Sequence, residues 1–244
     1  MKTFLNTLPV AHRGLHDAEK PENSLAAYEA AAQHGYAIET DLHIIKDGSI
    51  AVFHDDTLLR MTGDPRKIED CTMAELKELN LKDTAEKIPT LEEFLALVNG
   101  RVPLLIEIKN MEYRKTKEIV ETIAKALDGY KGEYAIQSFN PWYVKAYKKL
   151  RPKIMCGMLA SASTGKDFGG GFKGNFKSWV LRDLRLNFTV KPDFVSYGHW
   201  GFPRKSVNKF KGYKLAWTIR SREEEENARK YVDNIIFENY LAEK

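Results

Sequence analysis

Two acidic side chains, Glu39 and Asp41, stand two positions apart in a hydrophobic segment at residues 37–42. The segment predicts a β-strand, and side chains at this spacing in a strand point to the same face. A second hydrophobic segment follows the turn sequence "KDGS" and ends in His54, so the two segments predict a hairpin. Clustered carboxylates repel one another unless a cation joins them. The hairpin therefore predicts a metal site.

The register of this hairpin decides whether the histidine reaches the acids. If Asp47 and Gly48 are the two central residues of a type I′ turn, His54 lies directly opposite Asp41. Cross-strand partners have Cβ atoms about 5 Å apart. We therefore expect the carboxylates and the imidazole to form one cluster.

A third acid follows the same logic. Glu107 and Lys109 share one face of the strand expected at residues 103–109, near its carboxyl end. Together with Glu39 and Asp41, Glu107 offers three hard oxygen ligands. They suit Mg²⁺, Ca²⁺ or, as a further option, Mn²⁺, and they match zinc poorly.

Charged residues at the end of the first expected strand complete the site. The sequence "AHRG" supplies His12, Arg13 and Gly14. Three carboxylates, one divalent cation, Arg13 and Lys109 sum to about +1, a balance that suits a phosphodiester monoanion. Two histidines beside a metal allow general acid/base catalysis on a P–O bond.

Short hydrophobic strands alternate with helices along the chain. The expected strands are 8–11, 37–42, 103–109, 133–138, 154–159, 193–197, 213–218 and 234–237. The expected helices are 24–34, 72–80, 90–98, 115–127, 141–150, 178–186, 205–210 and 221–230.

Eight strands with helical connections are typical of the α/β class and its TIM (β/α)8 barrel, whose size is about 250 residues. An open doubly wound sheet is the alternative, but no Gly-rich dinucleotide turn follows the first strand. We expect a single domain over residues 1–244. A short insertion, made of the hairpin and residues 55–89, follows the second strand.

Composition narrows the class of protein. The chain has 244 residues, of which 43% are hydrophobic and 30% charged, as in ordinary globular domains. The net charge of +4 suits a small anionic ligand and, without a dense Lys/Arg run, argues against nucleic acid as a partner. Cys71 and Cys156 are too few for a disulfide framework, and we expect no signal peptide and no membrane span. These features predict a cytoplasmic protein, and they leave its oligomeric state open.

The segment 11–63 closely resembles the glycerophosphodiester phosphodiesterase family, whose motifs are H-R-G, P-E-N-T, E-x-D, an x-D-G turn and H-D. This sequence has, in the same order, His12-Arg13-Gly14, Pro21-Glu22-Asn23-Ser24, Glu39-x-Asp41, Asp47-Gly48 and His54-Asp55. Further positions that look like the family are Glu107-x-Lys109, Ser138-Phe139 and Trp217-Thr218.

The resemblance implies a TIM-barrel phosphodiesterase of the phospholipase C-like superfamily. The metal ligands that it implies are Glu39, Asp41 and Glu107. The acid/base pair that it implies is His12 and His54, with Arg13 and Lys109 at the phosphate. Phe139 and Trp217 stand at carboxyl ends of strands, and we expect them to line the pocket.

Three features depart from the family pattern. Ser24 replaces Thr, and either hydroxyl caps a helix. The last strand reads "VDNIIFENY" where the family has an Asp-containing segment, so the rim beside this strand is expected to differ. The insertion at 55–89 is short, which concerns substrate selectivity more than catalysis.

Other candidate residues receive more ordinary interpretations. His16, His34 and His199 are interpreted as loop or surface residues, and His43 as solvated or adjacent to the ligands rather than a ligand. The glycine-rich segment 165–177 follows the fifth strand and predicts a mobile loop with lysines at the catalytic face.

The favoured function is hydrolysis of glycerophosphodiesters, such as glycerophosphocholine or glycerophosphoethanolamine, to glycerol 3-phosphate and an alcohol. One alternative is a lysophospholipase D-type enzyme acting on lipid phosphodiesters. A rival from another class is a non-catalytic barrel that binds phosphorylated ligands. Such a protein is expected to have lost a histidine or a metal-binding acid, and this sequence has lost neither.

Overall fold

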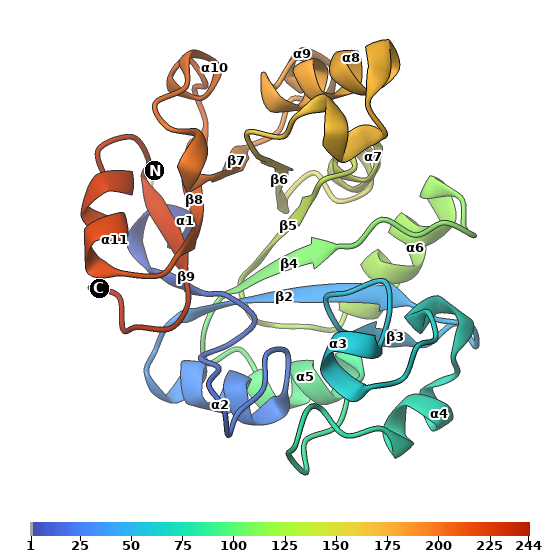
Figure 1. Cartoon of the computed structure of the whole chain (residues 1–244). Helices are drawn as coiled ribbons and strands as arrows, with labels where there is room; N and C mark the ends of the chain where they lie inside the picture. The colour runs from blue at the N-terminus through green and yellow to red at the C-terminus, as the bar shows by residue number, and fades with distance from the viewer. Residues whose placement is uncertain (1) are drawn as a thin grey trace.

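Eight parallel strands form a closed ring in the computed structural model, which describes residues 2–244. They are β1 Val10–Ala11, β2 Ala37–Ile44, β4 Leu104–Ile108, β5 Tyr134–Ser138, β6 Met155–Ala160, β7 Phe194–Gly198, β8 Tyr213–Ile219 and β9 Asn234–Phe237. The ring closes because β1 pairs with both β2 and β9. The TIM barrel expected from the sequence is confirmed, and the open sheet is wrong (Figure 1).

Helices lie outside the ring of strands (Figure 1). The longer ones are α2 Leu25–Gln33, α5 Leu91–Val98, α6 Thr116–Leu127, α7 Pro141–Leu150, α8 Gly171–Arg182 and α11 Arg222–Ala228, and the short ones outside the insertion are α1 Phe4–Thr7, α9 Asn187–Val190 and α10 Lys205–Asn208. Ser24 caps α2 and Ser221 caps α11, since their hydroxyls accept hydrogen bonds from the backbone N–H groups of Ala27 and Glu224. Within residues 2–244, none of the helices combines the length and the apolar character that crossing a bilayer requires.

The interior of the ring is apolar at the amino ends of the strands and polar at their carboxyl ends. The apolar end is one buried cluster that contains Phe4, Leu5, Val10, Ala37, Leu105, Ala135, Phe194, Leu215 and Ile236. Because strand side chains alternate between two faces, the next inward positions after Ala37 and Leu105 are Glu39 and Glu107. Alternation alone therefore stacks the acids on top of the packed layer.

The hairpin register expected from the sequence is wrong by one residue. Strand β3, Ile50–Val52, pairs with β2 so that Ile44 lies opposite Ile50 and Leu42 opposite Val52. The loop has three residues instead of two, because Gly48 adopts a left-handed φ of 87° after a turn in which its N–H donates to the Ile45 carbonyl. This turn followed by a left-handed glycine is the common three-residue hairpin loop.

One consequence is that Asp41 faces Phe53 across the hairpin, and its carbonyl accepts the Phe53 N–H at 3.0 Å. His54 is therefore not a cross-strand partner of Asp41. It lies beyond the last paired residue, Val52, where the chain has left the ladder.

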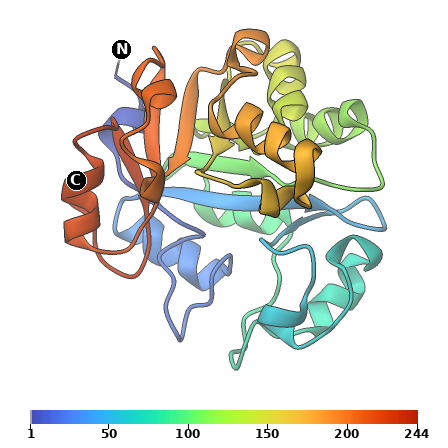
Figure 2. The same cartoon turned by 45° about the horizontal axis from the view of Figure 1, so that its top comes forward.

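The insertion after β3 packs around a small core of its own. It contains α3 Leu59–Thr62, the 3₁₀ helix η1 Ile68–Asp70 and α4 Met73–Glu78. Its buried core includes Phe53, Leu58, Ile68, Leu76 and Ile88. The insertion and α8 lie on different sides of β2 in both views (Figures 1 and 2).

The expectation of a loop at 165–177 is wrong. Residues Gly165–Phe168 form a 3₁₀ helix, η2, and α8 begins at Gly171, so the helix expected at 178–186 starts seven residues earlier and ends at Arg182. Phe172, Phe176 and Trp179 are all exposed and, at spacings of four and three residues, lie along one side of α8. The glycines of this segment suggest a loop, whereas the spacing of these aromatic residues is that of a helix.

Candidate active site

Three carboxylates meet at the carboxyl ends of β2 and β4. Asp41 and Glu107 are neighbours in the parallel ladder, and Glu39 lies on the same face as Asp41. One oxygen atom from each carboxylate lies within 4.8 Å of the other two, and all three side chains are buried. The structure thus brings together the three acids that the sequence singles out.

The buried acids change one another's protonation. Burial, and then the charges of Asp41 and Glu107, raise the pKa of Glu39 well above its usual range. Burial alone would also raise the pKa of Asp41, but Lys109, His54 and Arg13 outweigh it and hold that pKa below its ordinary value. Asp41 Oδ1 is buried and accepts no hydrogen bond from the described chain. Three converging oxygen ligands and one unused acceptor fit a divalent cation, so the cluster is a candidate metal site.

Two cationic side chains border the acids. Lys109 Nζ lies 3.1 Å from Glu107 Oε1 and 3.5 Å from Asp41 Oδ1. Arg13 Nε lies 3.5 Å from Asp41 Oδ2, and the Arg13 backbone N–H donates to Glu39 Oε2 at 3.0 Å. Burial lowers the pKa of Lys109, but Glu107 and Asp41 raise it further, so the side chain is charged. Both cations can face a phosphate held at the acids.

The turn that carries Arg13 depends on a glycine. Arg13 has a φ of 54° and Gly14 a φ of 81°, both in the left-handed region. A Cβ atom at Gly14 would lie 2.8 Å from the backbone carbon of Ala27 in α2. Only glycine lets this turn rest on the helix and direct the two preceding side chains into the site.

The "PENS" segment, residues 21–24, forms hydrogen bonds with two side chains of the site. Glu22 Oε1 accepts a hydrogen bond from Arg13 Nη1 at 2.7 Å, and Asn23 Nδ2 donates to Asp41 Oδ2 at 3.0 Å. Asn23 is buried and in turn accepts from the hydroxyl of Tyr28 at 2.6 Å. Glu22 and Asn23 therefore orient Arg13 and Asp41.

His12 is held by an acid that the sequence analysis did not single out. Its Nδ1 lies 2.5 Å from Glu238 Oε2, directly after β9, and Arg220 Nε donates to the other oxygen of Glu238 at 2.8 Å. A carboxylate accepts only, so Nδ1 carries the proton and Nε2 is left as an acceptor. Burial, and then Arg13, lower the pKa of His12 to about 4, which makes the neutral imidazole the dominant form near neutral pH.

His54, which follows β3, also has a carboxylate at its Nδ1 atom, as His12 does. Its Nδ1 lies 2.6 Å from Asp55 Oδ1, and Asp55 is fixed by Arg60 Nε at 2.6 Å. Arg60 also donates to both oxygens of Glu22, the residue that holds Arg13. The insertion therefore contributes a residue that orients the site, in addition to the substrate selectivity with which the sequence analysis connects it.

We expect Glu238→Gln to lower kcat by about 10²–10⁴, the usual range for lost acid/base function, with KM and metal affinity little changed. The glutamine oxygen can accept from Arg220, which leaves its NH₂ group facing His12. Nδ1 must then accept, the proton moves to Nε2, and the acceptor is lost. Steady-state kinetics and metal titration check this, with Glu226→Gln, at an exposed position on α11, as the matched control. A fall in metal affinity as large as the fall in kcat would contradict a positioning role.

The remaining histidines differ in part from their expected places. His43 is fully buried beside the site instead of solvated, with Nδ1 unbonded within the described chain, because β2 remains covered by the insertion beyond Asp41. His16 is also largely buried, with Nε2 3.5 Å from Glu238 Oε2. His34 is exposed at the end of α2, as expected, and His199 lies partly exposed in the short helix η3 His199–Gly201.

A small central cavity of about 40 Å³ joins these groups. Its lining includes His12, Arg13, Glu39, His54, Glu107, Gln137, Phe139 and Trp217. The rings of Phe139 and Trp217 meet edge to face at 5.7 Å, and the Trp217 indole N–H is taken by the Ser196 carbonyl at 3.0 Å. Both aromatic residues thus present apolar surface, while Gln137, not foreseen from the sequence, lies beside Glu107 on β5.

A parallel barrel with an acidic cluster at the carboxyl ends of its strands, and with two carboxylate-paired histidines beside it, has the arrangement of the barrel enzymes. Residues 12–171 match the sequence model of the Glycerophosphoryl diester phosphodiesterase family. The chain belongs to this family.

Similar proteins agree in length as well as in sequence. A glycerophosphodiester phosphodiesterase of Caldanaerobacter subterraneus is 31% identical to this chain, and the match covers 95% of this chain and 94% of the relative's length. Glycerophosphodiester phosphodiesterase 1 of Bos taurus is 37% identical over 96% of this chain and 77% of its own. The solved structure of an Oleispira antarctica phosphodiesterase, in complex with its product sn-glycerol-3-phosphate, superposes with a TM-score of 0.77 at 26% identity. It covers 94% of this chain and 93% of that one.

Proposed function

We propose that this protein hydrolyses glycerophosphodiesters, such as glycerophosphocholine and glycerophosphoethanolamine, to glycerol 3-phosphate and the free alcohol. The observation that carries the proposal is the convergence of three buried carboxylates, two cations and two histidines at one barrel mouth. Membership of the family and the product bound to the Oleispira antarctica relative point to the same substrate class. A non-catalytic barrel would not need two histidines each held by its own carboxylate.

We further propose that Glu39, Asp41 and Glu107 hold the metal. A bound divalent cation would withdraw charge from the phosphate oxygens and favour attack at phosphorus. Carboxylate ligands favour Mg²⁺, Ca²⁺ or Mn²⁺ over softer ions. Arg13 and Lys109 supply the remaining positive charge for the phosphate.

The two histidines divide the proton transfers. His12 is neutral and presents Nε2, so it accepts the proton of the attacking oxygen, which belongs to water or to the glycerol 2-hydroxyl. His54 gives a proton to the departing alcohol as its bond to phosphorus breaks and the new P–O bond forms. Glu238 keeps His12 in the tautomer with Nε2 free to accept a proton. His54 must carry a proton on both ring nitrogens to donate from Nε2, and the Asp55 carboxylate faces the Nδ1 of that ring.

Release of choline and ethanolamine from the two glycerophosphodiesters, with each of the three cations added in turn, tests this function. We expect release of the alcohol together with an equal amount of glycerol 3-phosphate. Absence of release with every cation, from protein that is folded by circular dichroism, would overturn the proposal.

A further inference from the structure

A second group of potential metal ligands lies beside the proposed base. It consists of His12, His16 and Glu238, and one donor atom from each lies within 4.8 Å of the other two. The two histidines come from the segment that follows β1, and Glu238 directly follows β9. The proposed reaction uses His12 and Glu238 but gives His16 no role. The Nε2 atom of His16 is buried and has no hydrogen-bond partner within the described chain.

The donor atoms of this group differ in kind from those of the three acids. Two imidazole nitrogens and one carboxylate oxygen form a common zinc ligand set, and imidazole also suits Cu²⁺ and Ni²⁺. The acids offer oxygen alone, which suits Mg²⁺ and Ca²⁺. The local charge leads to the same division, because Arg220 Nε donates to Glu238 Oε1 at 2.8 Å and offsets its negative charge. An ion that depends on anionic oxygen gains little here, whereas zinc also bonds to neutral nitrogen.

The distances within the group are close to those of a zinc site. Tetrahedral zinc with bonds of about 2.0–2.1 Å holds its ligand atoms about 3.4 Å apart. His16 Nε2 lies 3.5 Å from Glu238 Oε2, and His12 Nδ1 lies 2.5 Å from the same oxygen. The contact between His12 and Glu238 must therefore open by about 1 Å to admit the ion. The three side chains keep between 11% and 17% of their exposure, so an ion can reach them from solvent.

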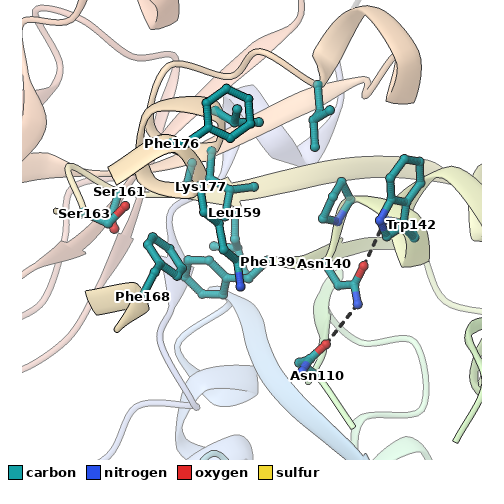
Figure 3. Close-up of a pocket in the computed structure, with 15 residues that line it drawn as sticks. Asn110, Phe139, Asn140, Trp142, Leu159, Ser161, Ser163, Phe168, Phe176 and Lys177 are labelled. Carbon is teal, nitrogen blue, oxygen red and sulfur yellow. Dashed lines mark hydrogen bonds between the residues drawn. The ribbon is translucent and has the colours of Figure 1, made fainter. Parts of the chain in front are cut away.

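The apolar cavity next to the site offers no comparable ligands. Its volume is about 570 Å³, and it shares Phe139 and Leu159 with the central cavity. No imidazole, thiolate or carboxylate belongs to its lining, and the polar side chains that Figure 3 labels there are Asn110, Asn140, Ser161, Ser163 and Lys177. Two histidines, His12 and His54, line the central cavity. Among the described residues, His12 is the one of these two that belongs to a three-ligand group.

We propose that His12, His16 and Glu238 form an inhibitory site for Zn²⁺ or a similar transition-metal ion. The ion takes the lone pair of His12 Nδ1, and the single proton of that ring moves from Nδ1 to Nε2. Nε2 then cannot accept the proton of the attacking oxygen, so the enzyme loses its base while the activating cation stays at the acids. His16 binds through Nε2 and keeps its proton on Nδ1, so neither ring releases a proton. The loss of turnover rests on the proposed function, whereas binding of the ion does not depend on it.

Cobalt(II) tests the binding without any measurement of turnover. Co²⁺ held by few ligands, two of them nitrogen, absorbs visible light much more strongly than Co²⁺ among six oxygen ligands. With saturating Mg²⁺ present, we expect one equivalent of Co²⁺ to give the strong absorption in the unchanged protein and in Glu39→Gln. His16→Gln should lose this absorption. His34→Gln, which removes an exposed imidazole, is the matched control and should keep it.

Inhibition is measured on glycerophosphocholine as the Zn²⁺ concentration that halves the rate, with Mg²⁺, or whichever cation best supports turnover, at saturation. We expect His16→Gln to raise this concentration by at least about 10–100-fold, because the loss of a partner outside the ligand shell already costs a metal site that much affinity. A further increase in the activating cation should not relieve the inhibition. Each variant is compared with its own rate without zinc, so the comparison holds if the substitution alters that rate.

The outcomes separate this site from the acids and from the proposed function. Inhibition that the activating cation relieves, or equal zinc sensitivity of His16→Gln and the unchanged protein, overturns the inhibitory site. Weak cobalt absorption in the unchanged protein, or strong absorption that disappears in Glu39→Gln, overturns it as well. If His16→Gln does not fold by circular dichroism, His16→Asn takes its place in both measurements. Failure to hydrolyse glycerophosphocholine with every cation overturns the proposed function instead, and the cobalt spectra still test the binding site.

Discussion

Replacing His12 with alanine is expected to lower kcat on glycerophosphocholine by about 10²–10⁴, and His54→Ala to lower it by a similar factor. The two variants should differ on a glycerol phosphate ester of nitrophenol, whose leaving group departs without a proton. His54→Ala should then recover most of its rate, because His54 gives the proton. His12→Ala should stay slow, because the attacking oxygen still needs a base.

Metal titration of both variants provides the internal control, since neither histidine is a proposed ligand and both should bind the cation normally. His34→Ala, at an exposed position on α2, is the matched substitution and should behave like the unchanged protein. Recovery of His12→Ala rather than His54→Ala on the activated ester would reverse the assignment of base and acid. Rates within about tenfold of the unchanged protein for both variants would remove the histidines from the mechanism.

Removal of divalent cations is expected to abolish activity, and a saturating cation to raise Tm by about 5–10 °C at a concentration near a hundred times Kd. Glu39→Gln should change the Tm in the opposite way: the metal-free variant gains stability, and the cation adds little. Without metal, and at a pH above the raised pKa of Glu39, it removes a buried charge beside Asp41 and Glu107, so the variant should melt higher than the unchanged protein. With metal it lacks a ligand, so the cation should shift its Tm little.

The stability of the metal-free protein as a function of pH provides a second test of the role of Glu39. The folded pKa of Glu39 is raised above its ordinary value of 4.5, so the unchanged protein should gain stability as pH falls from the raised pKa towards 4.5. Glu39→Gln should gain less over the same range. Glu121→Gln, an exposed substitution on α6, serves as the control for both measurements. Full turnover after rigorous chelation, or an unchanged metal response in Glu39→Gln, would exclude this cluster as the metal site.

Much of the barrel could be predicted because it depends on local alternation. Glu39 and Asp41 share a face through spacing alone, and the strand expected at 37–42 is observed at Ala37–Ile44. Stacking of the inward positions above the apolar layer follows from the same period of two. For this reason the three acids converge as the sequence suggests.

The hairpin register could not be predicted, because the same residues fit two turns. "KDGS" suits a two-residue turn, and it also suits a three-residue loop with Gly48 left-handed. The longer loop places Phe53 in the buried core of the insertion. The choice between the turns therefore depends on packing contacts that a local pattern does not contain.

The carboxylate partners of the two histidines also differ in how far a local sequence pattern could reveal them. Asp55 was visible as a neighbour of His54, but its role depends on Arg60 and on the fold of the insertion. Glu238 lies 226 residues from His12 in the sequence. Its one signal was an acid directly after the last strand, at the end of the barrel where the chemistry lies.

The contact between His12 and Glu238 ties catalysis to completion of the chain. The proposed base, His12, follows the first strand, and the acid that orients it, Glu238, follows the last. The backbone N–H of His12 also donates to the Phe237 carbonyl at 2.9 Å. Residues 12–171, which suffice to recognise the family, lack β7, β8 and β9. A chain without these strands contains all three acids proposed as metal ligands, but it lacks the carboxylate partner of the proposed base, His12. The proposed base and the carboxylate that orients it therefore meet only when β9 pairs with β1 and closes the ring.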